Sequence, residues 1–173
     1  MPPGPSRRIL GIGVARVVLA LAAMAFLGWV ADLILALPPF LPLAWRGAGI
    51  APLAAGVALE AAATWAFWRH GGGTPHPASP PPRVVDHGPY AYSRNPLYMA
   101  RVIMLLGVAC LLGSTGVLAV DVVLLLGVHT IIIPHEEARL ERRLGDAYRD
   151  YRRRVGRWIT IRRDGTRRRL RTP

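Results

Sequence analysis

The stretch LYMARVIMLLGVACLLGSTGVLAVDVVLLLGVHTIIIP, residues 97–134, decides the fold of this chain. It contains two apolar runs, 97–112 and 116–134, with only Gly113, Ser114 and Thr115 between them. Three residues leave room only for a tight turn between two helices. We therefore predict that the two runs form an antiparallel helical hairpin.

Two further apolar runs precede the hairpin. A helix needs about 20 apolar residues to cross a hydrocarbon core of about 30 Å. Residues 9–37 exceed that length and carry only Arg16 and Asp32, close to the ends, where charged side chains reach the interface. Residues 50–68 end in aromatic residues of the kind found at membrane interfaces. The run 97–112 is short for a full crossing.

These runs predict the fold class and the domain organisation. We expect an all-α, polytopic membrane protein that forms a single membrane domain over residues 1–173. The predicted spans, about four in number, cover residues 9–37, 50–68, 97–112 and 116–134. A cytoplasmic loop over 69–96 and a basic cytoplasmic tail over 135–173 complete the chain.

Composition supports this class and excludes others. The chain of 173 residues is 52% hydrophobic and carries a formal net charge of +12. All 22 basic residues are arginines, and most follow Pro134. Because the charge is segregated from the apolar runs, we expect anionic lipid head groups at the basic tail, and no nucleic acid. A single cysteine, Cys110, excludes a disulfide scaffold, and no Cys/His spacing indicates a metal site.

Arginine placement predicts the orientation. Basic flanks tend to stay cytoplasmic, and arginines lie before the first run, between the second and third runs, and after the fourth. We therefore expect both termini in the cytoplasm. The arginine-only, Ala-, Gly- and Pro-rich composition favours a bacterial inner membrane. Five prolines and three glycines between Gly71 and Pro82 predict an extended loop.

The entry to the third run concentrates polar and aromatic residues in HGPYAYSRNPLY, residues 87–98. A structural interpretation is that Asn95 caps the following helix and Pro96 occupies its first turn. A cap alone does not require Arg94, three tyrosines and a histidine in so short a stretch.

A second polar cluster, Glu136 and Glu137, follows the fourth run. Two adjacent carboxylates at a helix end beside an anionic leaflet need positive partners. The hairpin would bring them close to Arg94 and Arg101, either as an ion-pair network or as a ligand site. Within the membrane, two arrangements are open to Glu60: pairing with Arg101 across the helices, or facing a cavity.

After Glu137 the sequence alternates charged and apolar residues with helical spacing. Residues 139–151 read as one amphipathic helix, whose Leu140, Leu144 and Tyr148 could fold back over a pocket. The arginine runs beyond it, at 152–154, 162–163 and 167–169, have no apolar periodicity. We expect those runs to contact anionic lipid or solvent.

Two motifs in the correct order resemble the isoprenylcysteine carboxyl methyltransferase and phospholipid methyltransferase superfamily. The first is Gly88-Pro89-Tyr90 followed by Arg94-Asn95-Pro96-Leu97-Tyr98. The second is Glu136-Glu137 with Leu140, Leu144-Gly145, Tyr148 and Tyr151. Two positions depart from the family pattern: Asn95 replaces the histidine of the isoprenylcysteine enzymes, and Leu144 replaces a phenylalanine.

The resemblance implies a membrane enzyme that transfers a methyl group from S-adenosylmethionine to a lipidic or prenylated acceptor. The cofactor would lie at the cytosolic end of the last two spans. By this analogy its binding residues are His87, Tyr90, Arg94, Asn95, Pro96, Tyr98, Glu136 and Glu137. As catalytic residues we predict Arg101, which could orient an acidic acceptor, and Glu60, which could serve as the base for an amine.

Two alternatives stay open at this point. One is a membrane reductase of sterol-like lipids that uses a nicotinamide cofactor. The other is a non-catalytic four-helix membrane protein whose charges only lock the helices together. The sequence leaves the acceptor, the group methylated and the oligomeric state undetermined.

Overall fold

The computed structural model describes residues 7–71 and 83–160, which form helices and connecting turns without a strand. The predicted all-α class is confirmed. The elements are α1 (Arg7–Leu35), η1 (Leu43–Gly49), α2 (Ile50–Gly71), η2 (Gly88–Ala91), α3 (Pro96–Leu112), α4 (Thr115–Gly127), η3 (Val128–Ile132), α5 (Ile133–Leu144) and α6 (Asp146–Arg154).

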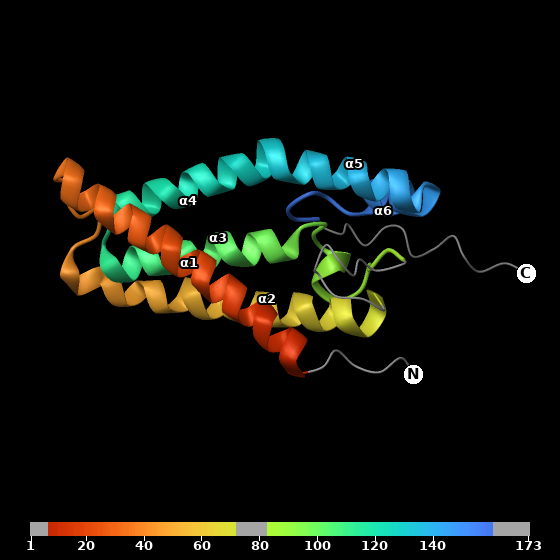
Figure 1. Ribbon diagram of the computed structural model, residues 1–173, viewed down its shortest axis with the longest axis horizontal. Coiled ribbons are helices and arrows are strands. Elements are labelled where there is room, and N and C mark those ends of the chain that lie inside the picture. Colours follow the sequence, from red (N-terminus) through yellow and green to blue (C-terminus); the bar gives the residue numbers. More distant parts are fainter. Residues whose placement is uncertain (1–6, 72–82, 161–173) are drawn as a thin grey trace, which may run out of the picture.

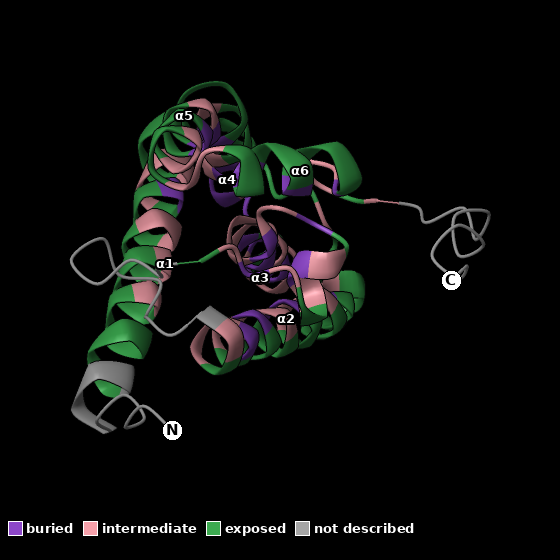
Figure 2. Ribbon diagram, turned by 90° about the vertical axis from the view of Figure 1, so that its right-hand side faces the viewer, coloured by how far each residue is buried: buried purple, intermediate pink, exposed green. Residues whose placement is uncertain are grey.

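Helices α2, α3 and α4 run along the long axis of the molecule, and α1 crosses them obliquely (Figure 1). In the view along that axis, α3 occupies the centre, with α2, α4 and α1 around it (Figure 2). The predicted hairpin of α3 and α4 is confirmed. Its turn is tight because Gly113 adopts a left-handed φ of 64° and the Ser114 side chain caps α4 by accepting from the Val117 N–H.

Three helical stretches are long and apolar enough to cross a membrane: Gly11–Leu35, Leu43–His70 and Thr115–Leu144. Helix α3 is apolar but has only 17 residues. At 1.5 Å per residue it is about 26 Å long, a little short of the hydrocarbon core. The predicted number of four spans therefore stays a prediction, with α3 as the span in question.

Pro134 does not end the helix that contains the fourth predicted span. The helix continues from Thr115 to Leu144 through a π-helical turn, η3, immediately before this proline. A proline cannot donate to the carbonyl four residues earlier, and its ring crowds that carbonyl. The wider turn, in which the Ile133 N–H bonds to the Val128 carbonyl, accommodates the proline without breaking the helix.

Close contacts between helices depend on glycines. A Cβ on Gly107 of α3 would collide with Leu53 and Gly49, so α2 and α3 pack backbone against backbone within the chain. A Cβ on Gly28 of α1 would likewise collide with the backbone of α4 at Gly116 and Val117. Apart from this crossing, α1 presents large apolar side chains outward (Figure 2), as a lipid-facing helix should.

Asp32, near the end of α1, does not face the head groups as predicted. Its carboxylate accepts hydrogen bonds from the Ser114 hydroxyl and, at 2.6 Å, from the Gly116 N–H. The side chain thus joins α1 to the beginning of α4, where backbone N–H groups have no helical partner.

We expect Asp32→Ala to lower the thermal stability of the protein in detergent. The substitution leaves the buried Ser114 hydroxyl and an N-terminal N–H of α4 without their acceptor, which costs about 1–3 kcal/mol. A thermal-shift measurement checks this, with Asp150→Ala, which removes a surface ion pair with Arg153, as the control. Equal melting temperatures for the two variants would contradict the role given to Asp32.

The predicted single helix over 139–151 is wrong, because the chain breaks at Gly145. This residue has φ 55° and ψ −129°, a conformation open to glycine, and it separates α5 from α6. The break turns α6 back, so that Tyr148 and Tyr151 pack with Leu140 and Leu144. The expectation that these apolar residues fold back over a pocket is confirmed below.

Candidate active site

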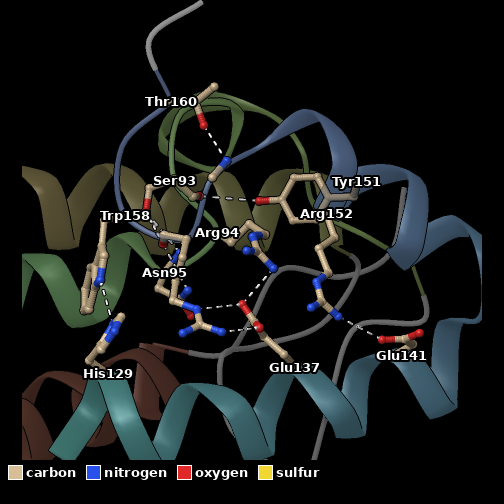
Figure 3. Close-up of polar contacts among 12 residues, drawn as sticks. Ser93, Arg94, Asn95, His129, Glu137, Glu141, Tyr151, Arg152, Trp158 and Thr160 are labelled. Atoms are coloured by element: carbon tan, nitrogen blue, oxygen red, sulfur yellow. Dashed lines mark hydrogen bonds and ion pairs between the residues drawn. The ribbon is translucent and has the colours of Figure 1, made fainter. Parts of the chain in front are cut away.

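A buried ion pair joins the two motifs. The Arg94 guanidinium, just before α3, lies 2.7 Å from the Glu137 carboxylate on α5. Their side chains are only 10% and 7% exposed. Figure 3 shows the two side chains pointing toward each other between the loop and α5. The antiparallel hairpin predicted this meeting, because it places the end of the fourth span beside the start of the third.

A second guanidinium holds the same carboxylate. Arg157 lies beyond α6 and reaches Glu137 with Nη2 at 3.0 Å from Oε2 and Nε at 3.4 Å from Oε1. The sequence analysis missed Arg157, since it follows a run of arginines without any motif. The separation of Arg157 from Glu137 in sequence does not predict their contact, because the turn at Gly145 sets the direction in which the chain returns.

Arg157 belongs to a segment, Val155–Thr160, that we call the C-terminal strap. The strap lies along the loop that carries Arg94: the Arg94 N–H donates to the Gly156 carbonyl at 3.0 Å, and the Thr160 N–H donates to the Tyr92 carbonyl at 2.7 Å. At the far side Trp158 donates its indole N–H to His129 Nδ1 at 3.1 Å (Figure 3).

Asn95 occupies the N-cap position of α3, but its side chain does not cap the helix. Its amide instead donates to the carbonyl of Arg157 at 3.1 Å. Pro96 at the first turn has no N–H, so one fewer donor needs a cap. The prediction of a side-chain cap is therefore wrong, and Asn95 contacts the strap.

Two further polar contacts connect the neighbouring helices. The Tyr98 hydroxyl donates to Glu136 Oε1 at 3.0 Å, which ties α3 to α5. The Arg101 Nη2 lies 3.2 Å from Glu60 Oε1, so the pairing of these residues across α2 and α3, one of the two possibilities left open, is confirmed. Arg101 Nε and Glu60 Oε2 are buried and have no hydrogen-bond partner among the described residues.

A cavity of about 240 Å³ opens beside these pairs. Its walls come from the first turns of α3, the inner face of α5, the buried face of α6 and the segment before η2. The predicted residues that line it are Tyr90, Arg94, Asn95, Pro96, Tyr98, Arg101, Glu136 and Glu137. Leu140, Leu144, Tyr148 and Tyr151 also line it, which confirms that α6 folds back over the pocket.

The structure places two other candidates away from the cavity wall. His87 stacks on His70 with ring centroids 4.5 Å apart and pairs with Asp86 at 2.8 Å, and its side chain is 63% exposed. Glu60 stands behind Arg101 and reaches the cavity only through that guanidinium.

The cavity is electrostatically positive. Its described lining includes two carboxylates, Glu136 and Glu137, and more guanidiniums, which belong to Arg83, Arg94, Arg101, Arg139 and Arg143. Burial raises the pKa of the Tyr90, Tyr148 and Tyr151 hydroxyls above the usual tyrosine value, so these phenols are neutral. The excess of positive charge suits a ligand with an anionic group.

Besides Arg101 Nε, a donor of Arg94 in this wall is unused. Arg94 Nε is buried and has no hydrogen-bond partner among the described residues. A buried guanidinium N–H without an acceptor costs free energy, so it favours a ligand that brings one. Glu136, which is exposed and accepts from Tyr98, can still accept from a ligand cation or hydroxyl.

A second, apolar cavity of about 350 Å³ lies on the other side of the same loop. Leu59, Met99 and Trp158 contribute to its lining, together with the backbone region from Gly88 to Ser93. Tyr98 and Arg94 line the first cavity, whereas their neighbours Met99 and Ser93 line the second. The beginning of α3 therefore separates a polar cavity from an apolar one.

Comparison with known proteins relates this arrangement to a family. No curated protein and no solved structure gave a significant match to the chain. A family model described as phospholipid methyltransferase matches residues 45–147, more than half of the chain. The matched part contains α2, the α3–α4 hairpin and α5, and with them Arg94, Glu136 and Glu137. The chain therefore belongs to the phospholipid methyltransferase family and is a membrane methyltransferase that acts on lipid.

Proposed function

We propose that this enzyme takes its methyl group from S-adenosylmethionine, bound in the 240 Å³ cavity at the start of α3. The observation that carries the proposal is the buried Arg94–Glu137 pair, whose Arg94 Nε faces no acceptor. A charged amino-acid moiety with a carboxylate and an ammonium matches an unused guanidinium N–H beside the available carboxylate of Glu136.

The residues present fit this donor. Arg94 would bind its carboxylate, Glu136 would accept from its ammonium or ribose hydroxyls, and Tyr90 and Tyr98 offer aromatic surface to a cation and an adenine ring. Asn95, predicted as a cofactor residue, would act through the strap, and His87, also predicted, would contribute from outside the cavity wall. The bound donor supplies an electrophilic methyl group on a sulfonium.

Methyl transfer of this kind is an in-line displacement. A bond from the acceptor atom to the methyl carbon forms while the carbon–sulfur bond breaks, and the sulfonium becomes a neutral thioether. The protein needs to align the two partners and exclude water, and it needs no nucleophilic residue of its own. The buried tyrosines of α6 and the leucines of α5 would keep the site dry.

We further propose that the acceptor is a membrane lipid, or a prenylated molecule, with an anionic group. Arg101 Nε would bind that group, since it is buried and unpaired within the described structure. Glu60 would hold Arg101 from behind the cavity wall, and its Oε2, equally unpaired in the described structure, would serve as the base for an amine that reaches past this guanidinium. The apolar cavity around Leu59 and Met99 would accommodate the acceptor's hydrocarbon chain.

The site would face the cytoplasm of a bacterial cell, at the inner membrane, with both termini on that side. Arginines flanking the predicted spans support this orientation. The exposed arginines of α5 and α6 would rest on anionic lipid head groups. The arginines at 162–163 and 167–169 lie outside the described residues.

Equilibrium binding tests the proposed donor. We expect S-adenosylmethionine to bind the detergent-purified protein with micromolar affinity in calorimetry, and a nicotinamide dinucleotide not to bind. Radiolabelled donor and vesicles of bacterial lipid should then give labelled lipid. Binding of the dinucleotide alone, or of neither ligand by a folded sample, would contradict the proposed donor.

A further inference from the structure

The C-terminal strap contacts the proposed donor site but lies outside the part of the chain that matches the family. The match ends at residue 147, and the strap begins at Val155. Nevertheless Arg157 of the strap holds Glu137, the most deeply buried carboxylate of the site. The matched region therefore does not contain the complete polar site.

The contacts of Glu137 leave it little capacity for a ligand. Arg94 Nη1 lies 2.7 Å from Oε1, and Arg157 Nη2 lies 3.0 Å from Oε2. Arg157 Nε also reaches Oε1, at 3.4 Å. Both oxygens thus face guanidiniums, and the group of three carries a net charge of +1. Such a group attracts an anion and repels an ammonium.

The other carboxylate of the motif, Glu136, differs from Glu137 in its exposure and in its partners. Glu136 is exposed, accepts one hydrogen bond from a neutral donor, Tyr98, and lines the cavity. Within the described residues, no guanidinium contacts Glu136. Of the two adjacent glutamates, only this one retains a negative charge that a cation could use.

We propose that the strap forms part of the donor site and that its Arg157 acts as a positioning residue. Arg157 neutralises Glu137 and fixes that carboxylate against Arg94, so that Arg94 presents its free Nε to the carboxylate of S-adenosylmethionine. Glu136 receives the ammonium. This assignment rests on the proposed donor and adds which glutamate serves the ligand and which serves the protein.

The anchoring of the strap supports a positioning role. Asn95 Nδ2 and the Ser93 hydroxyl both donate to the Arg157 carbonyl, at 3.1 and 3.3 Å. The residues on either side of Arg94 thus hold the backbone of Arg157, while the Arg94 N–H holds Gly156. A change in the strap would therefore displace Arg94 and Glu137 before other residues of the site.

Two ligands that differ only in the carboxylate test the proposal: S-adenosylmethionine and its decarboxylated form. Calorimetry should be performed on the full-length protein in detergent with wild type, Arg157→Ala, Arg157→Lys and Arg153→Ala. Arg153 is a matched control, because it is also an arginine near the end of the chain but pairs with Asp150 on an exposed face.

We expect Arg157→Ala to weaken S-adenosylmethionine about 10- to 100-fold and to leave the decarboxylated ligand within about 3-fold of wild type. Arg157→Lys keeps the charge but lacks the two-pronged geometry, so its loss should be smaller and equally selective. Arg153→Ala should bind both ligands as wild type does. Retained affinity for the decarboxylated ligand also shows that the variants are folded.

Equal losses for the two ligands would overturn the proposal, because the strap would then only support the cavity. Unchanged binding of both by the Arg157 variants would overturn it as well. Failure of the proposed function looks different: wild type itself would bind neither ligand, and the role given to Arg157 would fall with it.

Discussion

Arg94→Ala is expected to lower the affinity for S-adenosylmethionine by 100-fold or more. The substitution removes a buried guanidinium of the cavity wall that has an unused N–H, and with it a charge-assisted hydrogen bond of about 1.5–3 kcal/mol. It also leaves Glu137, now held by Arg157 alone, facing the carboxylate of the ligand. The two effects act in the same direction.

The measurement is calorimetric titration of detergent-purified protein. Arg94→Lys keeps the charge without the planar fork and should recover only part of the affinity. Arg149→Ala is the control, since this arginine also pairs with carboxylates, Glu141 and Asp146, but on the exposed face of α6. Wild-type affinity in a folded Arg94→Ala variant would remove this residue from the donor site.

Glu137→Ala is expected to produce the largest loss of stability among single substitutions at the site. Two guanidiniums converge on this carboxylate, and its side chain is 7% exposed. Without it, Arg94 would remain buried beside another positive charge with no counter-ion. Removing one partner of a buried ion pair costs about 3–5 kcal/mol. Unfolding in denaturant, followed by circular dichroism in detergent, would measure the change.

The chain offers a matched control for this substitution. Glu141, one turn further along α5, also bridges two arginines, Arg149 and Arg152, but at the surface. Hydrogen bonding to Arg149 holds the pKa of its carboxyl below the usual value, so the pair is charged at neutral pH. Because solvent screens it, Glu141→Ala should change stability little. A similar loss in the two variants would show that burial does not matter at Glu137.

The ion-pair network and the proposed ligand site, which the sequence presented as alternatives, do not exclude each other. The Arg94–Glu137 pair links the loop before α3 to α5, as a structural network does. The same pair leaves Arg94 Nε unused at the cavity, as a ligand site does. Stability and binding measurements on the same variants therefore report on both roles.

Local patterns predicted most of the helices. Apolar runs of about 20 residues fix where helices form in a membrane, because every backbone group must be satisfied within the segment. The turn at residues 113–115 was short enough to fix the antiparallel hairpin, and the hairpin in turn placed Arg94 beside Glu137. For the hairpin and the meeting of Arg94 with Glu137, the short connection in sequence allows only one arrangement of the two helices.

Other features depended on contacts that no local pattern records. Pro134 stays within a helix because the π turn η3 accommodates it. Gly145 separates α5 from α6, although the apolar periodicity predicted a single helix there. Asn95 has the sequence of a cap, yet its amide is drawn to a carbonyl 62 residues further along the chain. The local preference is worth about 1 kcal/mol at Gly145 and Asn95, where tertiary contacts outweigh it, and about 3 kcal/mol at Pro134, where the π turn relieves it.

By itself the sequence determined an all-helical chain with apolar spans and the two polar segments that approach each other at one end of the hairpin. Only the tertiary structure decided that Arg157 returns to Glu137 and that the strap takes the side chain of Asn95. The physical reason is the separation in sequence over which each interaction acts. Helix formation and a three-residue turn are set by neighbours in sequence, whereas the partner of a buried charge is set by which distant segment folds against it.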